Sequence, residues 1–336
     1  MARSPEAVSV AVRDLWAGYG GRRASTTILA GLDFSLSPGE RLAVVGQSGC
    51  GKSTLLHVLA GLLPALNGEA LVDGRQVAAA DFEASGRPGC RSGHAAYMFQ
   101  RDLLLPWKTV LGNATFAAGV APGSRGRGRS LGGREEAGRP PLEARARAIL
   151  GEFGLGDALG ELPARLSGGM RQRVALARTL VLGRGLVLLD EPLGSLDALT
   201  RAEMQSWLLD VMEAHPATWV LVTHDVREAV LLGDRVAVLA GRPARLEGWL
   251  PVPLSASERR RLAGLDAGDL PAFARVLAVR PGPTGSQGGP QADDGGPESD
   301  EAAGPDNVDS GLESAAHTMR RLAAQVHGLL RQRRTG

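Results

Sequence analysis

The chain has 336 residues, of which 43% are hydrophobic and 22% are charged, and its formal net charge is +2. These values are typical of soluble globular proteins, and they exclude a small disulfide scaffold, a fibrous chain and a wholly disordered one. The chain has two cysteines, Cys50 and Cys90, which exclude a disulfide framework and favour a reducing compartment. No apolar run approaches the roughly 18 residues of a membrane-spanning helix, and the first residues lack a secretory signal. We therefore expect any membrane role to be peripheral.

The first eighty residues predict strands around a glycine-rich loop. Alternating apolar residues at 8–12 and 32–36 predict two antiparallel strands. The apolar run 42–45 predicts a strand that leads through GQSGCGKST into a helix over 55–63, ending at Pro64. Shorter strands are predicted over 70–72 and 96–99.

Further along the chain, helical and strand patterns alternate. The sequence predicts helices over 142–153, 168–182, 198–212 and 226–232. It predicts strands over 186–189, 218–222 and 236–239. This alternation indicates an α/β fold with a mostly parallel sheet covered by helices on both faces.

Three segments stand apart from this pattern. Residues 119–141 are rich in Gly, Arg and Pro and predict a disordered surface insert. Residues 281–311 are rich in Pro, Gly and acidic side chains and predict a disordered acidic linker. In residues 312–336 the apolar positions step by three and four, which predicts an amphipathic helix; we expect it to pack on its own domain.

The glycine-rich loop carries the clearest chemical signal. The pattern G-x-x-x-x-G-K-[ST] is met by Gly46, Gln47, Ser48, Gly49, Cys50, Gly51, Lys52 and Ser53, with Thr54 following. Strand before and helix after are the context in which this pattern binds nucleotide phosphates. Backbone N–H groups converge on the phosphates, Lys52 bridges the β- and γ-oxygens, and the Ser53 hydroxyl ligates Mg²⁺.

A second signal is the apolar run 186–189, which ends in Asp190 and Glu191. In a chain with a phosphate loop, such a strand places a carboxylate at the edge of the sheet beside that loop. We therefore expect Asp190 to contact Mg²⁺ and Glu191 to polarise the attacking water as a general base.

Between these motifs lies LSGGMRQR at residues 166–173, which resembles the signature of ATP-binding cassette (ABC) ATPases. A helix that begins at Ser167, Gly168 and Gly169 can offer its N–H groups and a hydroxyl to a phosphate. In isolation, the same residues would be read as an ordinary helix N-cap. The resemblance implies that they cap the γ-phosphate bound by another subunit.

The remaining landmarks of that family occur in the same order. Tyr19 resembles the aromatic residue that stacks on adenine, and Gln100 resembles the glutamine that reaches Mg²⁺ and the water. Ser195-Leu196-Asp197 resembles the loop that crosses the dimer interface, and His224 resembles the histidine that contacts the γ-phosphate. The resemblance covers residues 8 to about 250.

The resemblance implies a P-loop NTPase fold with a mostly parallel sheet, an N-terminal antiparallel β-subdomain and an α-helical subdomain. The ATPase domain would span residues 1–250, with the helical subdomain at about 101–182 and a C-terminal extension at 251–280. It further implies an ATPase whose two copies close head to tail on two Mg²⁺–ATP molecules. That closure would drive a transporter from the cytoplasmic face of the membrane.

Within the family, the stretch LLLPW at 103–107 with Asn113, and DRV at 234–236 with GRP at 241–243, resemble importers of nitrate, sulfonate, taurine and thiamine precursors. This resemblance implies separate membrane permease subunits and, indirectly, an extracytoplasmic solute-binding protein, with no nucleic acid partner. Two alternatives remain open: an exporter or lipoprotein-release ATPase, and a soluble ABC ATPase that acts on nucleic acid.

Cys50 has two interpretations. Near a helix N-terminus its thiol pKa could be lowered, which would make ATP binding sensitive to oxidation. The interpretation that we favour is a small filler residue, because the phosphate contacts of this loop come from the backbone.

Overall fold

The computed structural model describes residues 6–21, 24–77, 95–119, 141–263, 321 and 323–329. The predicted disordered insert, apart from its two end residues, lies outside the described residues. Cys90 and the whole acidic linker also lie outside them.

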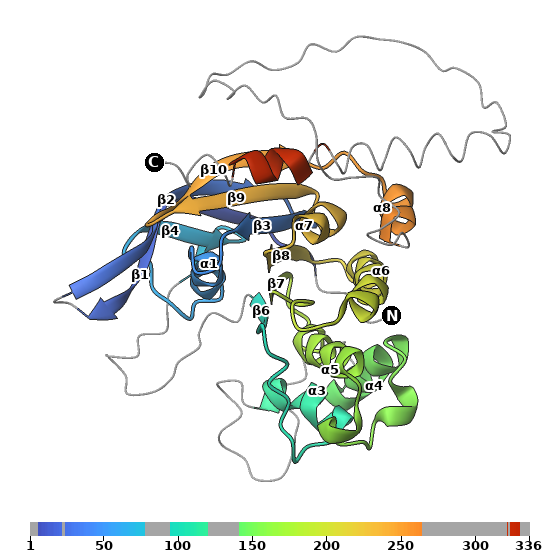
Figure 1. The fold of residues 1–336 in the computed structure, drawn as a ribbon. Helices are drawn as coiled ribbons and strands as arrows, with labels where there is room; N and C mark the ends of the chain where they lie inside the picture. The colour runs from blue at the N-terminus through green and yellow to red at the C-terminus, as the bar shows by residue number, and fades with distance from the viewer. Residues whose placement is uncertain are drawn as a thin grey trace, which may run out of the picture.

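The described strands form one mixed sheet with the order β5-β4-β1-β2-β10-β9-β3-β8-β7-β6 (Figure 1). Their bounds are β1 (Val10–Gly21), β2 (Ala24–Leu36), β3 (Arg41–Gly46), β4 (Asn67–Val72), β5 (Arg75–Gln76), β6 (Ala95–Met98), β7 (Leu186–Asp190), β8 (Thr218–Thr223), β9 (Arg235–Gly241) and β10 (Ala244–Pro251). Strands β9, β3, β8, β7 and β6 run parallel, whereas β1 pairs antiparallel with β2 and β4. The predicted fold class is therefore confirmed, with both parts joined in a single sheet through β10 and β2.

Helices lie on both sides of this sheet (Figure 1). Their bounds are α1 (Lys52–Leu59), α3 (Val110–Gly119), α4 (Leu142–Glu152), α5 (Gly168–Leu180), α6 (Ala198–Ala214), α7 (Val226–Leu232) and α8 (Ala256–Ala263). Two short 3₁₀ turns, Gly156–Ala158 and Pro163–Arg165, connect α4 to α5. Across the parts of the chain that the structure describes, no helix has the length and apolar character needed to cross a membrane.

The parallel strands are buried on both faces, which explains their unbroken apolar sequences. On β3, Leu42 and Val44 belong to a core shared with α1 and the antiparallel strands. The alternate residues, Ala43 and Val45, belong to a second core shared with helices α3 to α8. Every residue of β7 and β8 is buried.

Helix α1 differs from its predicted span at both ends. It begins at Lys52, directly after the glycine loop, and ends at Leu59 instead of Leu63. The early end follows from Gly61, whose φ of 68° is left-handed and whose N–H donates to Val58 O at 2.9 Å. A glycine in this conformation terminates a helix without the steric cost that other residues would have.

The far C-terminal residues return to the sheet. Residues 323–329 are helical, and Ala323 and Val326 are fully buried. Leu329 packs against Gly248 of β10, where an added Cβ would lie 3.0 Å from Leu329 Cδ1. The described part of the predicted terminal helix therefore packs on the chain's own domain, across β10 (Figure 1).

Candidate nucleotide-binding site

The glycine loop lies between β3 and α1, at the carboxyl end of a parallel strand. Gly49 and Gly51 have φ values of 74° and 112°, a left-handed conformation that L side chains rarely adopt. Space is also restricted, because a Cβ on Gly51 would lie 2.7 Å from Ile28 Cγ2. Backbone N–H groups in such a loop, together with the N-terminus of α1, form an anion site.

Lys52 brings a positive charge to this loop. Its Nζ donates to Gly46 O at 3.0 Å and to Gln47 O at 3.1 Å, and the side chain is buried. The ammonium group is thus held at the loop, as the predicted role in phosphate binding requires.

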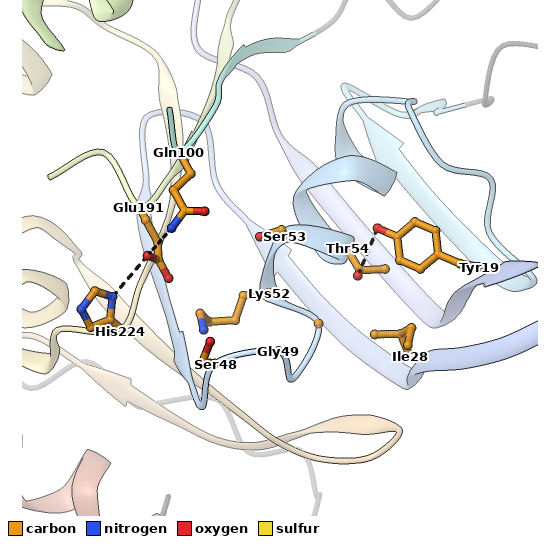
Figure 2. Close-up of a pocket in the computed structure, with 11 residues that line it drawn as sticks. Tyr19, Ile28, Ser48, Gly49, Lys52, Ser53, Thr54, Gln100, Glu191 and His224 are labelled. Carbon is orange, nitrogen blue, oxygen red and sulfur yellow. Dashed lines mark hydrogen bonds and ion pairs between the residues drawn. The ribbon is translucent and has the colours of Figure 1, made fainter. Parts of the chain in front are cut away.

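Three polar side chains meet beside the glycine loop: Glu191, Gln100 and His224 (Figure 2). Gln100 Nε2 donates to Glu191 Oε2 at 3.0 Å, and His224 Nδ1 lies 3.3 Å from the same oxygen. Glu191 has a φ of 45°, an uncommon value for a non-glycine residue that often marks a functional site. Three of the four residues that the sequence predicted as catalytic are therefore brought together, and the fourth, Lys52, lines the same cavity.

Asp190 and Ser53 lie close to this group. Ser53 Oγ donates to Asp190 Oδ1 at 3.0 Å, and Asp190 is buried. The structure thus brings two of the three predicted Mg²⁺ ligands together. The third, Gln100, uses its amide nitrogen on Glu191 and keeps its amide oxygen available.

A cavity of about 590 Å³ lies between these groups. It is lined by Tyr19, Ile28, Ser48, Gly49, Gly51, Lys52, Ser53, Thr54, Gln100, Glu191 and His224. Tyr19 is partly exposed, and its hydroxyl lies 3.0 Å from His57 Nδ1 and 3.4 Å from Thr54 Oγ1. Ile28 was not predicted, because its strand pattern gives no sign that β2 passes under the loop.

The predicted phosphate-capping residues do not line this cavity. Ser167 caps α5 by accepting a hydrogen bond from Met170 N at 3.2 Å, and a Cβ on Gly168 would lie 3.5 Å from Leu196 Cδ2. Gly169 is buried against α6, and Asp197 caps that helix by accepting from Thr200 N at 3.0 Å. Hydrogen bonds from Thr200 hold the pKa of Asp197 below its usual value. These residues form a second cluster, separate from the cavity of the same chain.

Cys50 is buried, with its Sγ 3.9 Å from Leu239 O. Burial raises the pKa of the Cys50 thiol, and the nearby Lys52 offsets this only in part. A raised pKa disfavours the reactive thiolate. The geometry therefore supports the interpretation of Cys50 as a filler residue, and the lowered pKa of the alternative interpretation is wrong.

A phosphate loop between strand and helix, with two acids at the end of another parallel strand of the same sheet, defines the class of P-loop ATPases. Residues 29–194 match the family model described as ABC transporter. The chain belongs to the ABC transporter family.

Relatives and solved structures place the chain more narrowly. It is 43% identical over 264 residues to the aliphatic sulfonates import ATP-binding protein SsuB 1 of Paraburkholderia xenovorans, covering 79% of this chain and 67% of that protein. It is 40% identical over 272 residues to SsuB 2 of Agrobacterium fabrum, covering 81% of this chain and 90% of that protein. A dimeric structure of the ATP-binding cassette MJ0796, in a post-hydrolysis state with ADP and Pi, matches with a TM-score of 0.57 and 26% identity, covering 73% of this chain and all of that one.

Proposed function

We propose that the protein is the ATP-hydrolysing subunit of an importer for aliphatic sulfonates or chemically related organic anions. It works peripherally, at the cytoplasmic face of the membrane, against separate permease subunits. The observation that carries this proposal is the convergence of Lys52, Ser53, Gln100, Glu191 and His224 on one cavity. The choice of an importer over an exporter or a nucleic acid-dependent ATPase is supported by relatives that are named as sulfonate import proteins.

Glu191 is arranged to act as the general base. Its Oε2 is occupied by Gln100 and His224, so that Oε1 can accept a proton from a water molecule in the cavity. His224 approaches Glu191 through Nδ1, which leaves Nε2 to contact the γ-phosphate. The loop amides and Lys52 hold the phosphate chain, and the Tyr19 ring provides a surface for the base.

The oxygen donors fit a magnesium ion. Ser53 Oγ and Asp190 Oδ1 lie 3.0 Å apart and face each other, and the amide oxygen of Gln100 is not used by Glu191. Magnesium in ATPases is held by one or two such groups together with substrate phosphates and water. No group of three or more His, Cys, Asp or Glu side chains suited to a metal occurs among the described residues. When bound, the ion neutralises charge on the phosphate oxygens.

The functional unit in this proposal is a head-to-tail homodimer. Ser167, Gly168 and Gly169 present a helix N-terminus away from their own cavity, which leaves them free to cap the phosphates of a second copy. Asp197 lies on the loop that packs against them and would cross the same interface. The structurally similar cassette MJ0796 has been solved as a dimer.

Glu191→Gln tests the dimer. The amide cannot take the proton, so the variant should bind Mg²⁺–ATP without turnover and accumulate as a closed dimer in multi-angle light scattering. The matched control adds Ser167→Arg, at an exposed position where the long side chain crowds the capping face. That double variant should still bind nucleotide but remain monomeric. A Glu191→Gln protein that stays monomeric at saturating Mg²⁺–ATP would contradict the shared-site mechanism.

The surface for the permease is proposed to lie on the helical part of the chain. Three large apolar side chains of this part are exposed: Leu103 by 51%, Trp107 by 72% and Phe116 by 40% of their surface. Asn113 is fully buried, and its side chain accepts from Leu105 N at 2.7 Å and donates to Lys108 O at 2.9 Å. The loop that presents Leu103 and Trp107 is therefore fixed to helix α3.

The transported substrate is tested in proteoliposomes that contain this ATPase with its permease. A solute-binding protein loaded with an aliphatic sulfonate should stimulate hydrolysis, whereas the same assay with nitrate or a thiamine precursor should not. Stimulation by nitrate alone would replace the sulfonate assignment with another anion.

A further inference from the structure

Tyr97 of β6 has a role in the site that the motifs do not assign. Its hydroxyl donates to Asp190 Oδ2 at 2.9 Å, while Ser53 Oγ donates to Asp190 Oδ1 at 3.0 Å. Each oxygen of this buried carboxylate thus has its own donor. One donor comes from strand β6 and the other from helix α1, so that the carboxylate is held from two sides.

The Tyr97 ring is itself held by neighbouring rings. It packs 4.6 Å from the Phe99 ring and 5.7 Å from the His57 ring, measured between centroids. His57 is tied in turn to the Tyr19 hydroxyl at 3.0 Å.

We propose that Tyr97 is a positioning residue that fixes the Asp190 carboxylate in the orientation needed for magnesium binding. The χ2 torsion of an aspartate is broad and roughly two-fold, and does not fix the carboxylate plane by itself. With Oδ2 bonded to Tyr97, Oδ1 is turned toward Ser53, where the other oxygen donor for the metal lies. Without the Tyr97 hydroxyl, a buried charged oxygen loses its donor and the carboxylate is free to rotate. This inference rests on the proposed nucleotide-hydrolysing function.

Tyr97→Phe removes one oxygen atom and keeps the ring contacts, which makes it the sharpest test. Binding of a fluorescent ATP analogue is titrated with Mg²⁺ and compared with binding in EDTA. The half-saturating Mg²⁺ concentration should rise on the order of tenfold, as expected for losing a hydrogen bond to a charged group. Affinity in EDTA should stay the same.

Thr179→Val is the matched control for a merely structural effect. It also removes a buried hydroxyl, which donates to Ala175 O at 3.0 Å on α5, outside the cavity lining. It should lower thermal stability and leave the half-saturating Mg²⁺ concentration unchanged. If Tyr97→Phe also lowers thermal stability but leaves the half-saturating Mg²⁺ concentration unchanged, the positioning role of Tyr97 is wrong. If the wild-type protein binds the analogue with no response to Mg²⁺, the proposed function fails as well.

Fluorine NMR gives an independent measurement on the unsubstituted site. The chain has two tyrosines, so that 3-fluorotyrosine labelling gives two resonances, and Tyr19→Phe identifies the one from Tyr97. Adding Mg²⁺ to the ATP-bound protein should shift the Tyr97 resonance beyond the shift that ATP causes in EDTA. A Tyr97 resonance that does not respond to Mg²⁺ would overturn the inference even if Tyr97→Phe failed to fold.

Discussion

One buried cation, Arg259, attaches helix α8 to the body of the ATPase, and its removal gives a sharp test of the packing. The guanidinium is 1% exposed, and it donates to Leu231 O and Gly233 O at 2.7 Å and to Val230 O at 3.1 Å. These carbonyl groups lie at the C-terminal end of α7, where no intrahelical N–H can reach them. Burial lowers the pKa of Arg259 to about 10, so that the group is still charged at neutral pH.

The change to make is Arg259→Met, which keeps the apolar stem and removes every donor. Each buried carbonyl left without a partner costs about 1–3 kcal/mol, although partial relaxation makes the sum less than additive. Loss of one partner from a buried charged network typically costs about 3–5 kcal/mol. We expect the free energy of unfolding to fall by about that amount. Arg259→Lys keeps the charge with fewer donors and should lose roughly half as much.

The assay is urea unfolding followed by circular dichroism, with Arg260→Met as the matched control on the same helix. Arg260 is half exposed and pairs with Asp210 at 3.0 Å and with Glu213, so that its loss should change stability little. If Arg259→Met and Arg260→Met unfold at the same urea concentration, Arg259 does not hold the helix, and the reasoning from its carbonyl contacts is refuted.

Three further predictions follow from buried or close contacts. Burial, and then the charge of Asp225, raises the pKa of Glu228 to about 8, so that the folded state holds a proton which the unfolded state releases near pH 4.5. The free energy of unfolding of the wild type should therefore fall as pH rises from about 5 to 8. Glu228→Gln has no such proton to lose, so that its free energy of unfolding should gain several kcal/mol relative to wild type over that range. If the difference between the two proteins stays constant with pH, the prediction is wrong. Gly248→Leu should displace Leu329 from β10 and speed proteolysis of the C-terminal segment. The affinity for ATP should not change, because Gly248 does not line the cavity, and an unchanged rate of proteolysis would contradict the packing of Leu329 on β10. Tyr19→Ala should raise KM for ATP about tenfold with kcat nearly unchanged, whereas Tyr19→Phe should keep the stacking surface; equal KM values for Tyr19→Ala and wild type would exclude a base contact.

The strands that could be predicted from the sequence are those whose apolar pattern directly reflects how they are buried. Strands β3, β7 and β8 appear as continuous apolar runs because both of their faces are buried. The glycine loop and the paired acids could be predicted for a related reason, whereas Tyr19, Gln100 and His224 were predicted from the family resemblance. Glycines with left-handed φ, a lysine and paired acids are demanded by phosphate chemistry, so that their spacing survives in the sequence as a motif.

The missed elements lack such a pattern for identifiable reasons. In β10 the register shifts between Leu246 and Gly248, which breaks the alternation that would reveal a strand. Helix α3 contains Gly112 and the buried Asn113, and therefore does not look amphipathic. Helix α8 looks like an exposed charged segment, because its main buried contact is Arg259. Both β10 and α8 make stabilising contacts with residues distant in the sequence, so that the local pattern does not reveal these elements.

The site is assembled by strand order. The phosphate loop follows β3, His224 follows β8, Glu191 follows β7 and Gln100 follows β6, and these strands are successive neighbours in the sheet. Since parallel strands lie about 4.8 Å apart, four segments distant in sequence reach one sheet edge within the span of a nucleotide triphosphate.

The same edge is tied to the exposed apolar surface through α5. Arg178 donates to Leu103 O at 2.9 Å and to Asp102 O at 2.6 Å, and Arg171 pairs with the Asp102 carboxylate at 3.3 Å. Both arginines lie on the helix that Ser167 caps. The segment that follows Gln100 and the helix that carries the proposed phosphate-capping residues are therefore held together by these contacts. A displacement of Leu103 has to carry α5 with it or break these hydrogen bonds. In the proposed dimer, a permease bound at this surface would act in this way on the cavity of one copy and on the capping helix that faces the other.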